Sequence, residues 1–224
     1  MPIARANGLD IAYETFGRDT DPPLVLIMGL AAQRIFWDEA FCELLARRGF
    51  FVVRFDNRDV GQSTKVDHLG KPNVLELMQA LQQRRVPSAP YGLADMADDT
   101  LGLMDALGLE SAHVCGASMG GMIAQVLALR RPERVLSLTS IMSSTGDPEL
   151  PQAAPPVLAL LLQPAPRDQT SYLDYAVKLW RTIGSPGFPF DEAAVRERAA
   201  LAWERGLHPA GVLRQLLAIL ADGS

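Results

Sequence analysis

The stretch HVCGASMGGMIAQ, residues 113–125, places Ser118 between glycines in a GxSxG pattern. Residues 112–116 have the pattern of a strand and residues 119–131 that of a helix, so Ser118 falls on a sharp strand-to-helix turn. Such a turn strains the backbone and needs small neighbours, which the flanking glycines supply. It also presents the hydroxyl at a helix N-terminus, where free N–H groups favour negative charge. The pattern predicts a serine nucleophile for acyl transfer; the alternative is a glycine-rich turn that only joins a strand to a helix.

A serine nucleophile needs a base, and the chain has three histidines. His113 precedes Ser118 in the same strand by about 16 Å at ~3.3 Å per residue, which is too far for a hydrogen bond. His68 falls in a loop and His208 stands just before a helix, so a solvated loop role and a helix-start role are favoured over catalysis. Asp147 follows a strand, and a turn or cap role is favoured for it.

The first part of the chain alternates strand and helix patterns. The pair Asn7-Gly8 suits a tight turn between two antiparallel strands. Residues 23–30 and 50–57 are nearly continuous apolar runs, typical of strands covered on both faces in a parallel sheet. A helix is expected between these two runs. Its predicted buried face and its terminal glycine are Trp37, Phe41, Leu44, Leu45 and Gly49.

Further alternation predicts a helix over about 91–107, then the strand and helix around Ser118, then a strand over 135–142. The fold class is therefore α/β, a mostly parallel sheet with an N-terminal antiparallel hairpin. After residue 144 prolines crowd the sequence and only helical patterns follow. We divide the chain into a core over 1–144 and a helical lid over 145–224. The lid includes a helix capped by Asp191 and a last helix with an apolar face of Leu213, Leu216, Leu217 and Leu220.

Four segments resemble the α/β-hydrolase superfamily, most closely lidded serine esterases of the aclacinomycin methylesterase type. They are LVLIMGLAAQ, RFDNRDVGQST, HVCGASMGGMIAQVLAL and PERVLSLTSIMSS. The resemblance implies an acyl-enzyme on Ser118, with the oxyanion bound by the backbone N–H of Met119 and that of Leu30 in the turn after the third strand. Many relatives have a histidine where Met28 stands. The apolar faces of the lid helices are expected to cover Ser118, so esters of small hydrophobic molecules are the predicted substrates.

The segment DNRDVGQS matches a loop of the same family, except that Asp59 replaces its first glycine. Asp56 and Arg58 are expected to order this loop as a charge-assisted pair, in preference to contacting substrate. A substrate pocket is predicted from Gln33, Trp37, Tyr172 and Trp180, for which core packing is the alternative role.

The superfamily takes its acid and histidine from segments that follow the lid. Both are therefore expected beyond Ser224, on about 60 further residues at ~30 per strand–helix unit, so the fold as given is predicted to be C-terminally incomplete and the fragment inactive. The predicted function is a serine esterase. The alternatives are a non-catalytic or truncated hydrolase scaffold that acts as a binding module and, within enzymes, a lactonase or a cofactor-free perhydrolase. Epoxide hydrolases and haloalkane dehalogenases need a carboxylate where this chain has Ser118, so the sequence argues against both activities.

The composition of the chain narrows the classes of partner and cofactor that it can bind. A net charge of −5 argues against nucleic acid and anionic membranes as partners. Two cysteines give no disulfide framework, and a cytoplasmic location is expected. No cofactor is predicted, because the chain lacks metal-site spacings and the GxGxxG pattern of a dinucleotide site. A small-molecule ester is the predicted partner. A second copy of the chain and a separate C-terminal segment are the alternatives left open for a protein partner.

Overall fold

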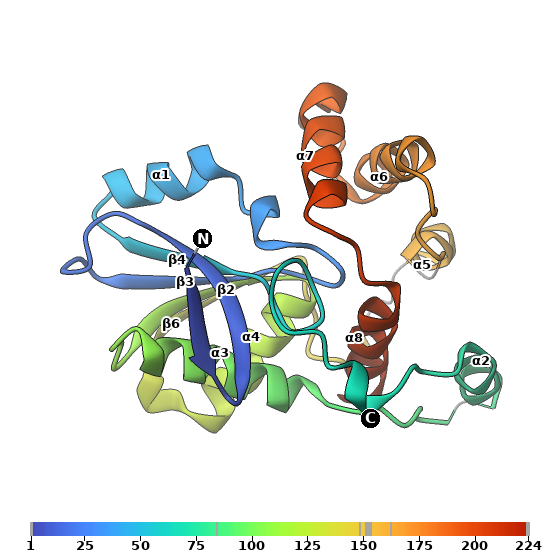
Figure 1. Ribbon diagram of the computed structural model, residues 1–224, viewed down its shortest axis with the longest axis horizontal. Coiled ribbons are helices and arrows are strands. Elements are labelled where there is room, and N and C mark those ends of the chain that lie inside the picture. Colours follow the sequence, from blue (N-terminus) through green and yellow to red (C-terminus); the bar gives the residue numbers. More distant parts are fainter. Residues whose placement is uncertain (1, 84, 148, 151–153, 162, 223–224) are drawn as a thin grey trace.

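The computed structural model describes residues 2–83, 85–147, 149–150, 154–161 and 163–222. Its sheet has six strands in the order β1-β2-β4-β3-β5-β6 (Figure 1). The bounds are β1 Ile3–Ala6, β2 Leu9–Phe16, β3 Pro23–Ile27, β4 Phe51–Phe55, β5 Ala112–Ala117 and β6 Val135–Ile141. Strands β1 and β2 pair antiparallel, as do β2 and β4, whereas the β4-β3-β5-β6 pairings are parallel. The predicted fold class and hairpin are confirmed.

The hairpin turn has the conformation that its residue types favour, with φ of 47° at Asn7 and 76° at Gly8. Strand β4 is buried along its whole length, as its apolar run predicts. Strand β6 forms one edge of the sheet and is largely exposed: Leu136 keeps 54% and Leu138 40% of its surface. Strands β3, β4 and β5 are parallel, so the turns that follow them, which carry Leu30, Asp56 and Ser118, lie at the same end of the sheet.

Helices cover both faces of the sheet, with α1 on one side and α3 and α4 on the other (Figure 1). The bounds are α1 Glu39–Arg47, α2 Val74–Gln82, α3 Leu93–Ala106, α4 Met119–Arg130, α5 Pro155–Leu161, α6 Gln169–Ile183, α7 Glu192–Glu204 and α8 Pro209–Asp222. Helices α3 and α4 pack with β1, β3, β4 and β5 around the main apolar core. Helix α2 was not predicted from the sequence.

Two predicted helix faces were wrong in part. In α1 the buried residue is Cys42, which packs with Leu45 in the smaller apolar core, whereas Phe41 and Leu44 keep 39% and 46% of their surface. In α8 only Leu217 of the expected leucines is fully buried, and the others are partly exposed. Arg214 and Gln215 are completely buried there instead, since they bind loops of the core.

The described part of residues 145–224 contains α5 to α8 and no strand. Helices α6 and α7 pack on each other, while α8 reaches the main core through Ala218. The division at residue 145 and the lid function of these helices stay predictions. Of the helices in the described residues, none combines the length and the apolar character that crossing a membrane requires.

Candidate active site

Ser118 occupies the turn between β5 and α4 with φ 54° and ψ −123°, a strained conformation for a residue with a Cβ. The glycines around it are in close backbone contact. A Cβ on Gly120 would overlap the carbonyl oxygen of Ile27, and one on Gly116 would overlap that of Gly120. One on Gly121 would lie 2.6 Å from the Cβ of Ser143. The predicted need for small residues at this turn therefore has a direct steric cause.

Hydrogen bonds hold the backbone of Ser118 and leave its hydroxyl uncommitted. Its N–H donates to the Ile141 carbonyl at 2.9 Å, and its carbonyl accepts from the Gly121 N–H and the Ser143 hydroxyl, each at 2.8 Å. Within the described residues the Ser118 hydroxyl has no hydrogen-bond partner in the protein, and the residue is partly exposed. The turn therefore holds a serine rigidly while presenting its oxygen.

The turn after β3 lies directly beside this serine. A Cβ on Gly29 would come within 3.1 Å of the Ser118 Cβ and 3.6 Å of its Oγ. Asn57 fixes the start of the turn by donating to the Met28 carbonyl at 2.8 Å. Among the described residues, no hydrogen bond uses the N–H of Leu30. The assignment of Leu30 and Met119 as oxyanion donors stays a prediction, and this juxtaposition is compatible with it.

Within the described residues, the contacts of the three histidines do not include Ser118. The His113 ring lies 2.7 Å from the Ser137 hydroxyl and contacts Phe50 edge-on. His208 Nε2 lies 2.9 Å from the Asp67 carboxylate, and His68 is exposed in a short 3-10 turn. Asp147 accepts from the Glu149 N–H at 2.9 Å, a turn contact. The described chain therefore gives Ser118 no histidine as a hydrogen-bond partner.

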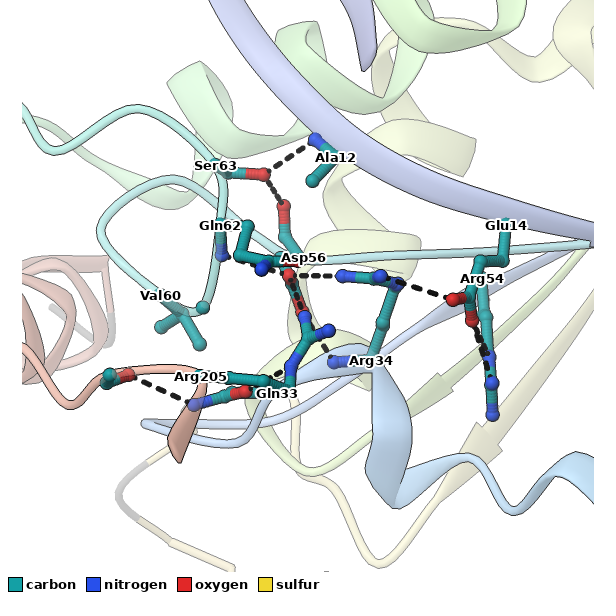
Figure 2. Close-up of polar contacts among 12 residues, drawn as sticks. Ala12, Glu14, Gln33, Arg34, Arg54, Asp56, Val60, Gln62, Ser63 and Arg205 are labelled. Carbon is teal, nitrogen blue, oxygen red and sulfur yellow. Dashed lines mark hydrogen bonds and ion pairs between the residues drawn. The ribbon is translucent and has the colours of Figure 1, made fainter. Parts of the chain in front are cut away.

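The predicted pair between Asp56 and Arg58 is wrong, because each residue is bound to a partner from elsewhere. Asp56, completely buried after β4, accepts from the Arg34 and Arg205 guanidinium groups, each at 2.6 Å. Figure 2 shows both arginines converging on this carboxylate, with the Gln62 N–H as a further donor. Arg58 instead binds Asp99 of α3 with two hydrogen bonds of 2.6 and 2.7 Å. Both residues thus order the loop, as expected, but through long-range ion pairs.

Asp59, the departure from the family pattern, has φ 71°, a backbone conformation that glycine adopts readily. Its buried carboxylate accepts two bonds from Arg214 of α8, at 2.7 and 2.8 Å, and one from the Tyr91 hydroxyl at 2.8 Å. Burial by itself raises the pKa of the Asp59 carboxyl, but these hydrogen bonds outweigh it and the pKa is lowered. Arg214 was not predicted from the sequence, where the available signal was an arginine inside an apolar helical face.

The four predicted pocket residues lie in different surroundings. Gln33 is buried and donates to the Ala202 and Gly206 carbonyls at 2.9 and 3.0 Å, so it binds the end of α7. Trp37 belongs to the smaller apolar core. Trp180 stacks on Phe36 and Tyr172 contacts Trp203, and burial raises the pKa of Tyr172 to about 12. Their role in a pocket stays a prediction. A cavity of about 570 Å³ lies between α2 and α8, and Ser118 is not among its lining residues.

Comparison with known proteins agrees with this architecture. Residues 22–181 match the family model described as the alpha/beta hydrolase fold, and the chain belongs to this family. It is similar to rhodomycin D methylesterase DauP of Streptomyces sp. (strain C5), with 34% identity over 209 residues that cover 84% of this chain and 64% of that protein. DnrP of Streptomyces peucetius, also a rhodomycin D methylesterase, is 32% identical over the same shares. The chain therefore spans 64% of the length of these relatives.

Other relatives cover less of the chain or are more distant. A putative carbamate hydrolase, RutD of Azorhizobium caulinodans, is 32% identical over 141 residues, 63% of this chain and 44% of that protein. Among solved structures, the meta-cleavage product hydrolase CumD of Pseudomonas fluorescens IP01 has a TM-score of 0.67 at 20% identity, covering 99% of this chain and 72% of that one. The latter likeness shows the fold.

Proposed function

We propose that the protein is a serine hydrolase that cleaves carboxylic esters of small hydrophobic molecules through an acyl-enzyme on Ser118. The observation that carries this proposal is the strained, glycine-packed turn that presents the Ser118 hydroxyl, which has no hydrogen bond to any described residue, beside the turn after β3. The similarity to two methylesterases supports an ester as the substrate and a methyl ester as the first class to test.

In the proposed reaction the Ser118 oxygen loses its proton to a base and attacks the ester carbonyl carbon. The carbonyl oxygen becomes an oxyanion, which accepts hydrogen bonds from the N–H groups of Leu30 and Met119. The tetrahedral intermediate collapses by releasing the alcohol, which takes up the proton. Water then attacks the acyl-enzyme by the same steps and frees the acid. A lactonase or a cofactor-free perhydrolase uses the same serine and differs in the pocket.

The base is proposed to come from a histidine outside residues 1–224, oriented by an acid that is also outside them. Two observations support this. Within the described residues, none of the three histidines is a hydrogen-bond partner of Ser118, and His208 and His113 are occupied elsewhere. The methylesterase relatives are also longer than the part that this chain covers. A separate polypeptide or an extension of the same chain satisfies the proposal equally.

The test is the reaction of the full gene product with a fluorophosphonate probe and with a chromogenic methyl ester. We expect covalent labelling and turnover that Ser118→Ala abolishes, because the acylated oxygen is then missing. Ser137→Ala is the matched control, since it removes a hydroxyl that contacts only His113 among the described residues. Residues 1–224 alone are expected to label at least about 1,000-fold more slowly, as in triads that have lost a member.

A binding module is the second candidate function, favoured by the absence of a histidine partner for Ser118 in the described chain. It predicts saturable binding of a hydrophobic ester without turnover, in which Ser118→Ala behaves as the wild type does. Equal turnover by the full gene product and its Ser118→Ala variant would reject the esterase proposal.

A further inference from the structure

Helix α8 contributes one side chain to the turn that carries the proposed oxyanion donor. Gln215 is completely buried, and its Oε1 accepts from the Ala31 N–H at 3.0 Å. Its Nε2 donates to the Arg58 carbonyl at 2.8 Å. Both ends of the amide are therefore used, and the donor contact to Arg58 fixes which end faces Ala31, because a flipped amide would set two oxygens against each other.

The contacted residue stands at the strained point of the turn. Ala31 has φ 62°, and it directly follows Leu30, whose N–H has no hydrogen bond within the described residues. The peptide that carries the Leu30 N–H is held by one long hydrogen bond, from the Ala32 N–H to the Gly29 carbonyl at 3.3 Å, and by the two adjoining peptides. At one end Asn57 binds the Met28 carbonyl, and at the other Gln215 binds the Ala31 N–H. Without Gln215 the second of these anchors is lost.

Gln215 is itself held in place by its neighbour in the sequence. Arg214 binds the Asp59 carboxylate with two hydrogen bonds and donates to the Gly70 carbonyl at 2.8 Å. The helix also lies close to this loop, since a Cβ on Gly211 would come within 2.5 Å of the Asp59 Cβ and 2.6 Å of the Asp59 carbonyl oxygen. The position of Gln215 relative to the turn is therefore fixed by contacts of Arg214 and Gly211 with Asp59 and Gly70.

We propose that Gln215 is a positioning residue that aligns the Leu30 N–H for the transition state of ester cleavage. The inference rests on the proposed function. Because the amide acts through the turn and is buried away from solvent, it affects the stabilisation of the oxyanion more than the binding of the ground-state ester. Helix α8 is then part of the catalytic apparatus and not only a cover over the site.

The test compares kcat and KM for the chromogenic methyl ester in variants of the full gene product. Gln215→Met keeps the shape and removes both hydrogen bonds. We expect kcat to fall about 10- to 100-fold, a part of the loss caused by deleting an oxyanion donor, with KM changed less than about 3-fold. Gln215→Glu keeps the acceptor for Ala31, and its neutral form also donates to Arg58, so its kcat relative to wild type should rise as the pH falls.

The control is Thr100→Val, which removes one buried hydrogen bond, to the Met96 carbonyl, in α3 and should lower stability without changing kcat. Amide hydrogen exchange at Ala31, read by NMR, should accelerate at least about 10-fold in Gln215→Met. An unchanged kcat in Gln215→Met would overturn the proposal, as would an equal fall of kcat in Thr100→Val or unchanged exchange at Ala31. If Ser118→Ala keeps wild-type turnover, the esterase proposal fails and the catalytic role of Gln215 fails with it, whereas faster exchange then shows that the contact itself is real.

Discussion

The turn around Ser118 and the loop after β4 lie at the same end of the sheet, yet they are held by opposite means. The serine turn depends on backbone atoms that approach where a side chain would collide, as at Gly116 and Gly120. The loop after β4 depends on buried carboxylates, Asp56 and Asp59, that bind arginines from distant segments. The first region is recognisable from a few neighbouring residues, although it packs on Ile27 and Ser143. The second is held in part by side chains from the C-terminal helices, Arg205 after α7 and Arg214 in α8.

The largest effect is expected from adding one methyl group at the serine turn. In Gly120→Ala the new Cβ overlaps the Ile27 carbonyl oxygen, a backbone atom that cannot turn aside. We expect the free energy of unfolding to fall by at least about 3 kcal/mol, the upper range for overpacked sites. Gly187→Ala is the control, because its Cβ would meet only the Ser185 hydroxyl at 3.6 Å. Urea unfolding measures both, and equal stability of the two variants would mean that the turn is not sterically constrained.

An effect of similar size is expected from the loss of a buried charge partner in the loop after β4. Arg214→Met leaves the completely buried Asp59 without its guanidinium partner. Removing one side of a buried ion pair costs about 3–5 kcal/mol, because the remaining charge stays desolvated. Arg47→Met is the control, since the Arg47–Glu43 pair is exposed on both sides, and its removal should cost under about 0.5 kcal/mol. Similar losses in both variants would show that the Asp59 pair is no more important than a surface pair.

This contrast also explains what sequence reasoning predicts and what it misses. The hairpin, the alternation of strand and helix around Ser118 and the glycine turn follow from short patterns, because the residues that signal them are neighbours in the chain. The partners of Asp56 and Asp59 do not, since Arg205 and Arg214 lie about 150 residues away and no spacing rule links them. The expected pairing of Asp56 with Arg58 failed for this reason: proximity in sequence was the only available guide. The buried face of α8 was mistaken because its polar residues carry long-range contacts.

A third effect depends on pH and follows from the lowered pKa of Asp59. The folded protein holds this carboxyl ionised through hydrogen bonds from Arg214 and Tyr91, which overcome the opposing effect of burial. Since the folded pKa lies below the unfolded one, the resulting stability is present above about pH 3.9 and is lost as the pH falls through the folded pKa. Asp59→Asn should therefore be clearly less stable than wild type at pH 7. The difference in urea unfolding should shrink toward pH 3, and a constant difference would contradict the ionic origin.

The smallest effect is expected from a substitution of His208, which tests the proposal that this histidine is not the base of Ser118. His208 Nε2 contacts the exposed Asp67 carboxylate, and neither residue touches Ser118 among the described contacts. His208→Gln keeps a donor of similar reach, so we expect a loss of stability under about 1 kcal/mol, as for a solvent-accessible pair. In the full gene product kcat for the methyl ester should stay within about 2-fold, because the base is proposed to lie elsewhere. A loss of several orders of magnitude, together with abolished fluorophosphonate labelling, would identify His208 as the base. Because His208 binds Asp67 in the segment after β4, the serine turn and this segment would then act together in catalysis and would not be two separate regions.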